Sequence, residues 1–184
     1  MKWTFLFVGV IVGVIAVVAV VGYMLPRDHV SAMSARVAAT PEAVWAVLAD
    51  PARFPTWRPD VKSVDVLPAT PTGPSWREHS GTGTITYVAD VFEPPRRMIA
   101  RITDEHLPFG GSWEYRVEPA SATDSKVTII ERGSVYNPIF RFVSRFVMGH
   151  TATIDVYLRA LGRKFGGETT PAIAAALEGH GHGL

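Results

Sequence analysis

The sequence contains no cysteine among its 184 residues. Disulfide bonds, thiol catalysis and cysteine-based zinc sites are therefore excluded. The sequence also lacks an excess of one sign of charge. It has 18 basic and 17 acidic side chains, and its formal net charge is +1. A nucleic-acid-binding domain usually carries a clear basic excess, so we expect no nucleic-acid partner.

Sequence motifs of catalysis and cofactor binding are also missing. The chain has no HExxH motif and no Ser–His–Asp signature, and Gly81 and Gly83 are not followed by the Lys–Ser/Thr pair of a phosphate-binding loop. His180 and His182, near the C-terminus, could hold a divalent cation weakly, but two histidines in a flexible tail usually have no metal-binding role. We expect no metal and no cofactor, and the sequence leaves open whether the protein is an enzyme.

The N-terminal segment is a long apolar run, with no charged residue in the 22 positions from Thr4 to Leu25. A helix of that length extends about 33 Å, enough for a hydrocarbon core of about 30 Å. A cleaved signal peptide is the alternative, but its apolar region is usually only about 7–15 residues long. We therefore favour an uncleaved transmembrane anchor over residues 1–27. Lys2 opposes Arg27 and Arg36, which leaves the side of the membrane open with a slight preference for an extracytoplasmic domain.

Residues 28–166 are interpreted as one α+β domain, and residues 167–184 as a flexible tail. Thr40–Glu42 provides an N-cap hydroxyl, a proline at the first helical position and an acidic first turn, which predicts a helix continuing to Ala49. Asp50–Pro51 repeats this signal for a second short helix. Seven segments show strand patterning: His29–Val37, Val61–Leu67, Trp76–Ser80, Thr84–Phe92, Met98–Thr103, Ser112–Glu118 and Lys126–Val135.

One long helix is predicted after the last strand. Asn137 can cap it, Pro138 fits its first position, and Gly166 ends it. Apolar residues recur at three- and four-residue spacing from Ile139 to Phe165, which predicts a buried face that covers the sheet. The opposite face is interpreted as solvated, with proximity to anionic headgroups as the alternative; its basic residues are Arg141, Arg145, Arg159, Arg163 and Lys164.

Three stretches carry a family resemblance: ATPEAVWAVLAD at 39–50, FPTWRPDV at 54–61 and FEPPRRM at 92–98. With the terminal helix, they make residues 29–166 resemble the START/Bet v 1-like superfamily, often labelled polyketide cyclase/dehydrase-like. The resemblance implies a helix-grip fold, in which a curved antiparallel sheet wraps a long C-terminal helix around a cavity. In this chain, one N-terminal transmembrane helix would precede the helix-grip domain. Members bind lipids, sterols, polyketides, quinones or hormones, and some catalyse ring closure or dehydration, so the resemblance transfers no catalytic residue.

An apolar pocket with a few polar tips is the expected site, because small-molecule pockets usually have this lining. Any single aromatic residue is more simply part of the core, and the set is proposed as a pocket because of the fold resemblance. His150 lies on the apolar face of the long helix, either as a hydrogen-bonded core residue or as a polar contact in the cavity. The candidate ligand-binding residues are Trp57, Trp76, Tyr87, Trp113, Tyr115, Phe146, His150 and Tyr157.

The remaining acid/base candidates lie within predicted strands: Glu78, His79, Asp90 and Glu131. Side chains alternate between the two faces of a strand, so Trp76 and Glu78 share one face and His79 lies on the other. If Trp76 points inward, Glu78 also points inward and His79 is solvated. Three hypotheses remain open. The leading one is a membrane-tethered binder or carrier of a lipid, quinone or polyketide-like molecule. The others are a cyclase or dehydratase that uses a cavity histidine or carboxylate, and a non-catalytic membrane-associated module.

Overall fold

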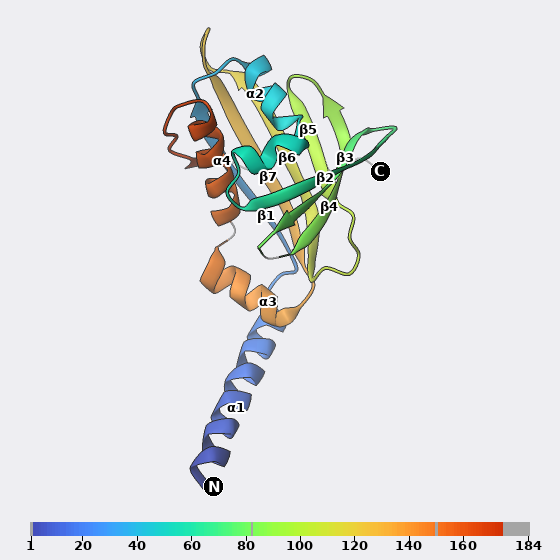
Figure 1. Cartoon of the computed structure of the whole chain (residues 1–184). Helices are drawn as coiled ribbons and strands as arrows, with labels where there is room; N and C mark the ends of the chain where they lie inside the picture. Colours follow the sequence, from blue (N-terminus) through green and yellow to red (C-terminus); the bar gives the residue numbers. More distant parts are fainter. Residues whose placement is uncertain (1, 82, 150, 175–184) are drawn as a thin grey trace, which may run out of the picture.

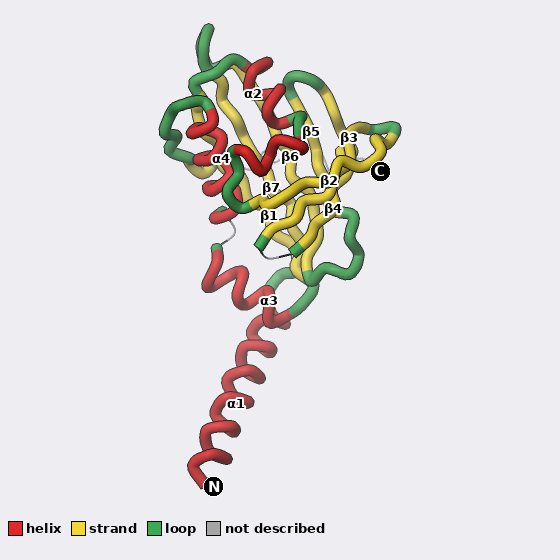
Figure 2. The backbone as a smooth tube through the Cα atoms, in the orientation of Figure 1, coloured by secondary structure: helices red, strands yellow, loops and turns green. Residues whose placement is uncertain are grey.

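The computed structural model describes residues 2–81, 83–149 and 151–174. One N-terminal helix leads into a curved antiparallel sheet, with α2 and α4 on the inner side of the curve (Figure 1, Figure 2). The predicted α+β class is confirmed, and the sheet curves around α4 as in a helix grip.

Eight strands form the sheet in the order β2-β3-β4-β5-β6-β7-β1-β8, and all neighbours are antiparallel. All seven strands predicted from alternation are present. Two of them are longer than predicted, because β2 continues to Thr70 and β3 begins at Gly73, so that only a short turn separates them. The strands are β1 (Asp28–Val37), β2 (Val61–Thr70), β3 (Gly73–Ser80), β4 (Thr84–Glu93), β5 (Arg97–Ile102), β6 (Phe109–Pro119), β7 (Ser125–Val135) and β8 (Ala172–Ile173).

Two short helices close one end of the sheet. α2 (Pro41–Leu48) begins as predicted, with the Thr40 hydroxyl accepting a hydrogen bond from the Ala43 N–H at 3.4 Å. The second helix, η1 (Pro51–Thr56), is a single 3-10 segment, because Pro55 lies within it. Leu48 and Phe54 point into the core and are fully buried.

The C-terminal helical region is divided, whereas a single helix was predicted over residues 138–165. α3 (Pro138–Val143) passes into a π-helical turn, η2 (Ser144–Met148). Gly149 then adopts φ 75° and ψ 146°, which is outside the helical region, and α4 (Ala152–Lys164) begins three residues later. Only α4 therefore lies in the grip of the sheet.

The start of α3 follows the predicted capping. The side-chain carbonyl of Asn137 accepts hydrogen bonds from the N–H groups of Ile139 at 2.9 Å and Phe140 at 3.2 Å. The described part of the predicted tail, residues 167–174, lies against the domain. Thr169 is buried and donates to the carbonyl of Leu158 at 3.1 Å, and β8 pairs with β1.

The N-terminal helix α1 (Lys2–Met24) is long and apolar enough to cross a bilayer, a property that a signal sequence shares. Its C-terminal end packs on α3. A β-carbon at Gly22 would overlap the carbonyl oxygen of Pro138, so the close approach requires glycine. Arg141 is buried and donates to the carbonyls of Gly22 at 3.3 Å and Leu25 at 3.1 Å. Helix-end carbonyls lack partners within the helix, and a cation suits that end of the dipole. Arg141 therefore caps α1 and does not belong to the solvated basic face that was predicted.

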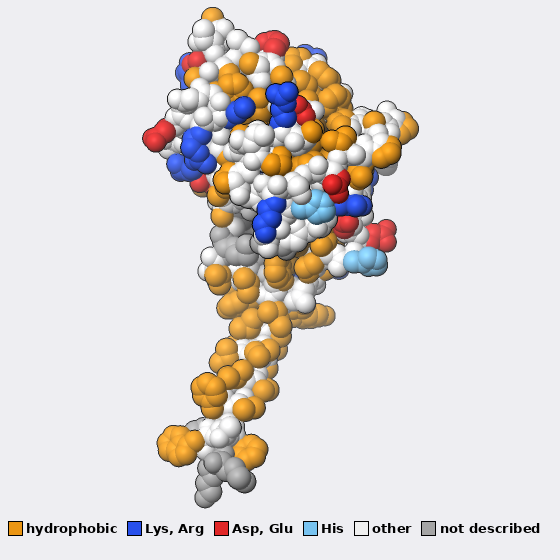
Figure 3. Space-filling view, in the orientation of Figure 1, with side chains coloured by type: hydrophobic (Ala, Val, Ile, Leu, Met, Phe, Trp, Pro, Cys, Tyr) orange, Lys and Arg blue, Asp and Glu red, His pale blue; other side chains and the backbone are white. Residues whose placement is uncertain are grey.

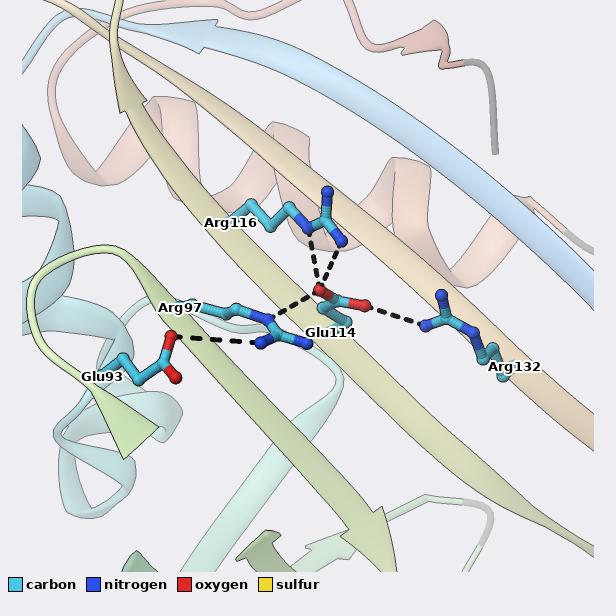
Figure 4. Close-up of polar contacts among 5 residues, drawn as sticks. All are labelled: Glu93, Arg97, Glu114, Arg116 and Arg132. Carbon is cyan, nitrogen blue, oxygen red and sulfur yellow. Dashed lines mark hydrogen bonds and ion pairs between the residues drawn. The ribbon is translucent and has the colours of Figure 1, made fainter. Parts of the chain in front are cut away.

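The outer face of the sheet holds one buried carboxylate. Glu114 on β6 is 1% exposed and accepts hydrogen bonds from Arg97 at 2.9 Å, Arg116 at 2.8 Å and Arg132 at 2.9 Å (Figure 4). Burial opposes ionisation, but the three guanidinium groups outweigh it and hold the pKa of Glu114 below its usual value. The cluster joins β5, β6 and β7, and we interpret it as structural.

Candidate functional site

The concave side of the sheet opens toward α1. The exposed fraction falls along the inward side of β1, from 17% for the His29 side chain to 7% for Met33 and zero for Val37. On the neighbouring strand β7 the exposed fraction also falls toward the end of the sheet where Val37 lies, from 22% for the Glu131 side chain to zero for Ile129. The grip is thus closed at the α2 end and open at the end where β1 follows α1.

Six of the eight predicted ligand-binding residues form one aromatic cluster on this concave side. Trp76, Tyr115 and Tyr157 are buried, whereas Trp57, Tyr87 and Trp113 are partly exposed. Each ring contacts at least one other, with Phe54 completing the chain of contacts. The centroid distances are 5.7 Å for Phe54–Trp57, 6.3 Å for Phe54–Trp76, 5.3 Å for Trp57–Tyr157, 5.4 Å for Trp76–Tyr87, 6.1 Å for Trp113–Tyr115, 5.8 Å for Trp113–Tyr157 and 5.6 Å for Tyr115–Tyr157.

A buried ion pair lies among these rings. Arg58, which follows η1, contacts Glu78 on β3 at 3.0 Å and Asp60 at 2.6 Å. Glu78 also accepts the indole N–H of Trp76 at 2.9 Å, as expected if both side chains point inward. Burial alone would lower the pKa of Arg58, but the two carboxylates outweigh burial and raise it above its ordinary value. The guanidinium therefore stays charged, with its carbon 4.9 Å from the centre of the Tyr157 ring.

Three buried donors in the cluster have no hydrogen-bond partner among the residues that the structure describes. They are Nε1 of Trp57, Nε of Arg58 and the hydroxyl of Tyr157. The Tyr157 hydroxyl lies near Tyr115, but the contact lacks hydrogen-bond geometry. A buried donor without a partner costs about 1–3 kcal/mol, and these three donors belong to side chains that pack against one another.

The tyrosines of the cluster are neutral hydrogen-bond donors. Burial raises the pKa of Tyr87, Tyr115 and Tyr157 well above 10, and the positive charge of Arg58 opposes this only in part. Their hydroxyls keep the proton at physiological pH. The aromatic cluster therefore offers neutral hydroxyl groups beside the charged Arg58, Glu78 and Asp60.

A histidine and a carboxylate lie at the open end of the grip. His29 Nε2 is 3.7 Å from Glu131 Oε1, and Glu131 lies opposite Trp113 in the β6–β7 register. The imidazole of His29 occupies the space where a side chain on Gly133 would be. Glu131 was predicted as an acid/base candidate. His29 was missed, because only the register between β1 and β7 brings it to this carboxylate.

The other predicted site residues lie elsewhere. Phe146 is 60% exposed on η2 and does not join the cluster. His79 points away from the grip and contacts Asp65 at 2.9 Å, and Asp90 pairs with Arg101 on the outer face. The candidates His150, His180 and His182 fall outside the described residues.

A cavity of about 510 Å³ lies beside this open end, at the rim of the sheet. It is lined by the ends of β5, β6 and β7, by residues 103–105 and by Tyr136, which precedes α3. Arg101 and Ser112 reach it from the outer face. Within residues 2–81, 83–149 and 151–174, no group of three or more metal-ligating side chains comes together.

Residues 28–165 match the family described as polyketide cyclase/dehydrase and lipid transport. No curated protein matches the chain. Solved structures share the fold at low identity. A START superfamily protein from Mycobacterium smegmatis is 16% identical, with a TM-score of 0.60, and the match covers 75% of this chain and 97% of the other. The Zhui aromatase/cyclase from a Streptomyces species is 17% identical, with a TM-score of 0.63 and coverage of 76% and 94%.

Norcoclaurine synthase from Thalictrum flavum has a TM-score of 0.60 at 11% identity, over 75% of this chain and 94% of the synthase. At such identities the likeness establishes the helix-grip fold alone. The START/Bet v 1-like resemblance seen in the sequence is confirmed by the family match and by these structures.

Proposed function

Because the chain belongs to the polyketide cyclase/dehydrase and lipid transport family, we propose that it binds a hydrophobic small molecule between the sheet and α4. We further propose that α1 tethers this binding domain to a membrane. The observation that carries the binding proposal is the convergence of three unpartnered donors, on Trp57, Arg58 and Tyr157, within a continuous aromatic cluster.

The charges around these donors favour a neutral acceptor. Arg58 is already paired with two carboxylates, Glu78 and Asp60, so the local net charge is −1 and a ligand carboxylate would be repelled. A carbonyl oxygen can accept from the Tyr157 hydroxyl and the Trp57 indole without adding charge. An apolar body with a ketone or quinone carbonyl fits this chemistry, which includes quinones and polyketide-like molecules.

Native mass spectrometry of the full-length protein, extracted from membranes in mild detergent, tests the proposal. We expect a non-covalent apolar adduct on the wild-type chain. Tyr157→Phe removes one unpartnered donor but keeps the ring, so it should lower adduct occupancy. Tyr136→Phe makes the same change at an exposed tyrosine outside the grip and should keep the adduct. A ligand-free wild-type protein, or equal occupancy in the two variants, would contradict the proposal.

A second candidate function is a cyclase or dehydratase, which the His29–Glu131 pair favours. An imidazole beside a carboxylate can remove a proton next to a ligand carbonyl, while a tyrosine hydroxyl stabilises the oxygen. The test is conversion of the recovered ligand to a product of different mass. His29→Gln should abolish conversion and leave binding intact. Unchanged ligand after incubation with wild-type protein would remove this candidate.

A further inference from the structure

The segment formed by α3 and η2, residues 138–148, presents an unusual apolar surface. Large apolar side chains point outward here, with Phe146 60% and Val147 72% exposed, and with Ile139 and Phe140 exposed as well. Figure 3 shows hydrophobic side chains along α1 and at the adjoining base of the domain. Water is a poor environment for such a surface, which indicates that something else covers it.

The junction with α1 determines where this segment lies. Gly22 and Arg141 hold α3 directly against the C-terminal end of α1. Figure 1 shows α3 and η2 running across that end of α1, beneath the sheet. If α1 spans a bilayer, this segment therefore begins at the boundary between acyl chains and headgroups and extends along it.

The composition of the region suits that boundary. Residues 132–154 contain no aspartate or glutamate, and Arg145 is exposed on η2. Two exposed tyrosines, Tyr23 and Tyr136, flank the junction. Aromatic rings with a polar tip favour the membrane interface, and amphipathic segments with arginine and phenylalanine side chains bind there.

We propose that α3 and η2 form an interfacial segment, with Phe146 and Val147 inserted into the bilayer surface. The proposal depends on the membrane tether proposed above. It also specifies the source of the ligand, because the open end of the grip, with His29 and Trp113, faces the same side of the domain as α1. A hydrophobic ligand then enters from the lipid phase and need not cross water.

Spin labels can test the insertion, because the chain has no cysteine and every introduced thiol is unique. Full-length single-cysteine variants are labelled with a nitroxide and reconstituted in nanodiscs of phosphatidylcholine and phosphatidylglycerol. Val147→Cys reports the interfacial segment. Val66→Cys on β2 is the matched control, since this valine is 67% exposed and lies on the sheet. Val12→Cys reports α1.

We expect the labels at Val147 and Val12 to collide with oxygen, which concentrates in lipid, and to be protected from an aqueous nickel complex. The label at Val66 should show the reverse. A label at Val147 as accessible to nickel as that at Val66 overturns the interfacial proposal. If Val12 remains in lipid in that case, the tether stands and only this inference fails. An aqueous Val12 removes the tether itself. Spin–spin broadening at Val147 would show that a second copy of the chain covers the surface, which also overturns the proposal.

Discussion

The ion pair beneath the aromatic cluster leads to a quantitative prediction. Glu78→Gln removes one charge while keeping the shape and an oxygen that can still accept the Trp76 indole. In the wild-type protein the Glu78 side chain is 10% exposed, and its carboxylate lies 3.0 Å from the Arg58 guanidinium. Removing one partner of a buried pair costs about 3–5 kcal/mol. Because Arg58 keeps Asp60 at 2.6 Å, we expect the lower end, about 3 kcal/mol.

That loss is a large fraction of the roughly 5–15 kcal/mol that stabilises a typical domain. In a domain of this size, about 3 kcal/mol lowers the melting temperature by roughly 10 °C. The assay is thermal unfolding of full-length protein in detergent, followed by near-ultraviolet circular dichroism of the buried tryptophans. Asp60→Asn is the matched control. It affects the same guanidinium, but its side chain is 39% exposed, so we expect a cost of about 1 kcal/mol or less.

A double-mutant cycle isolates the pair itself. Arg58→Met combined with Glu78→Gln should cost at least about 1 kcal/mol less than the sum of the two single changes, because each single change leaves one buried charge without this partner and the double change removes both charges. A change of under about 1 kcal/mol in the free energy of unfolding of Glu78→Gln, or additivity of the two changes within about 0.5 kcal/mol, would show that the buried pair does not stabilise the domain.

Three further predictions concern other parts of the chain. The stability that Glu114 contributes is complete above its ordinary pKa of 4.5 and disappears as pH falls through its lower folded pKa. Glu114→Gln should therefore reduce the acid sensitivity of the free energy of unfolding; an unchanged pH profile would contradict this. Gly22→Val should separate α1 from α3 and speed hydrogen exchange in α3 but not in the sheet; equal rates would contradict the packing. Ser125→Ala removes a 2.7 Å hydrogen bond to the buried Ala39 carbonyl and should lower the free energy of unfolding by about 1–3 kcal/mol. Urea unfolding measures this change, and a value near zero would contradict the prediction.

Much of the fold could be predicted because its signals are local. Alternating side chains indicated seven strands, and Thr40 and Asn137 indicated two helix starts by capping alone. The break at Gly149 could not be predicted in the same way. Apolar residues continue at helical spacing on both sides of it, and one glycine is tolerated within a helix. The environment of Arg141 was also hidden, because the carbonyls of Gly22 and Leu25, to which it donates, are more than a hundred residues away in the sequence.

The candidate site was predictable in part, but for a different reason. The fold resemblance, and not any local pattern, pointed to a shared pocket, and six of the predicted residues do contact one another. Arg58 lay within a quoted family motif, yet nothing in its spacing distinguished it from a surface arginine. Its pairing with Glu78 arises only from the packing of η1 against the sheet. His29 and Glu131 likewise become neighbours through strand register, which the sequence does not encode locally.

The connection between α1 and the sheet has a mechanical consequence. Only Leu25, Pro26 and Arg27 separate α1 from β1, and Arg141 ties the end of α1 to the base of the domain. A flexible linker would let a tethered domain search a volume around its anchor. Here the domain has almost no such reach. If α1 spans a membrane as proposed, the height and tilt of the domain above the lipid are fixed, and the domain can reach other membrane components only by lateral diffusion in the membrane plane.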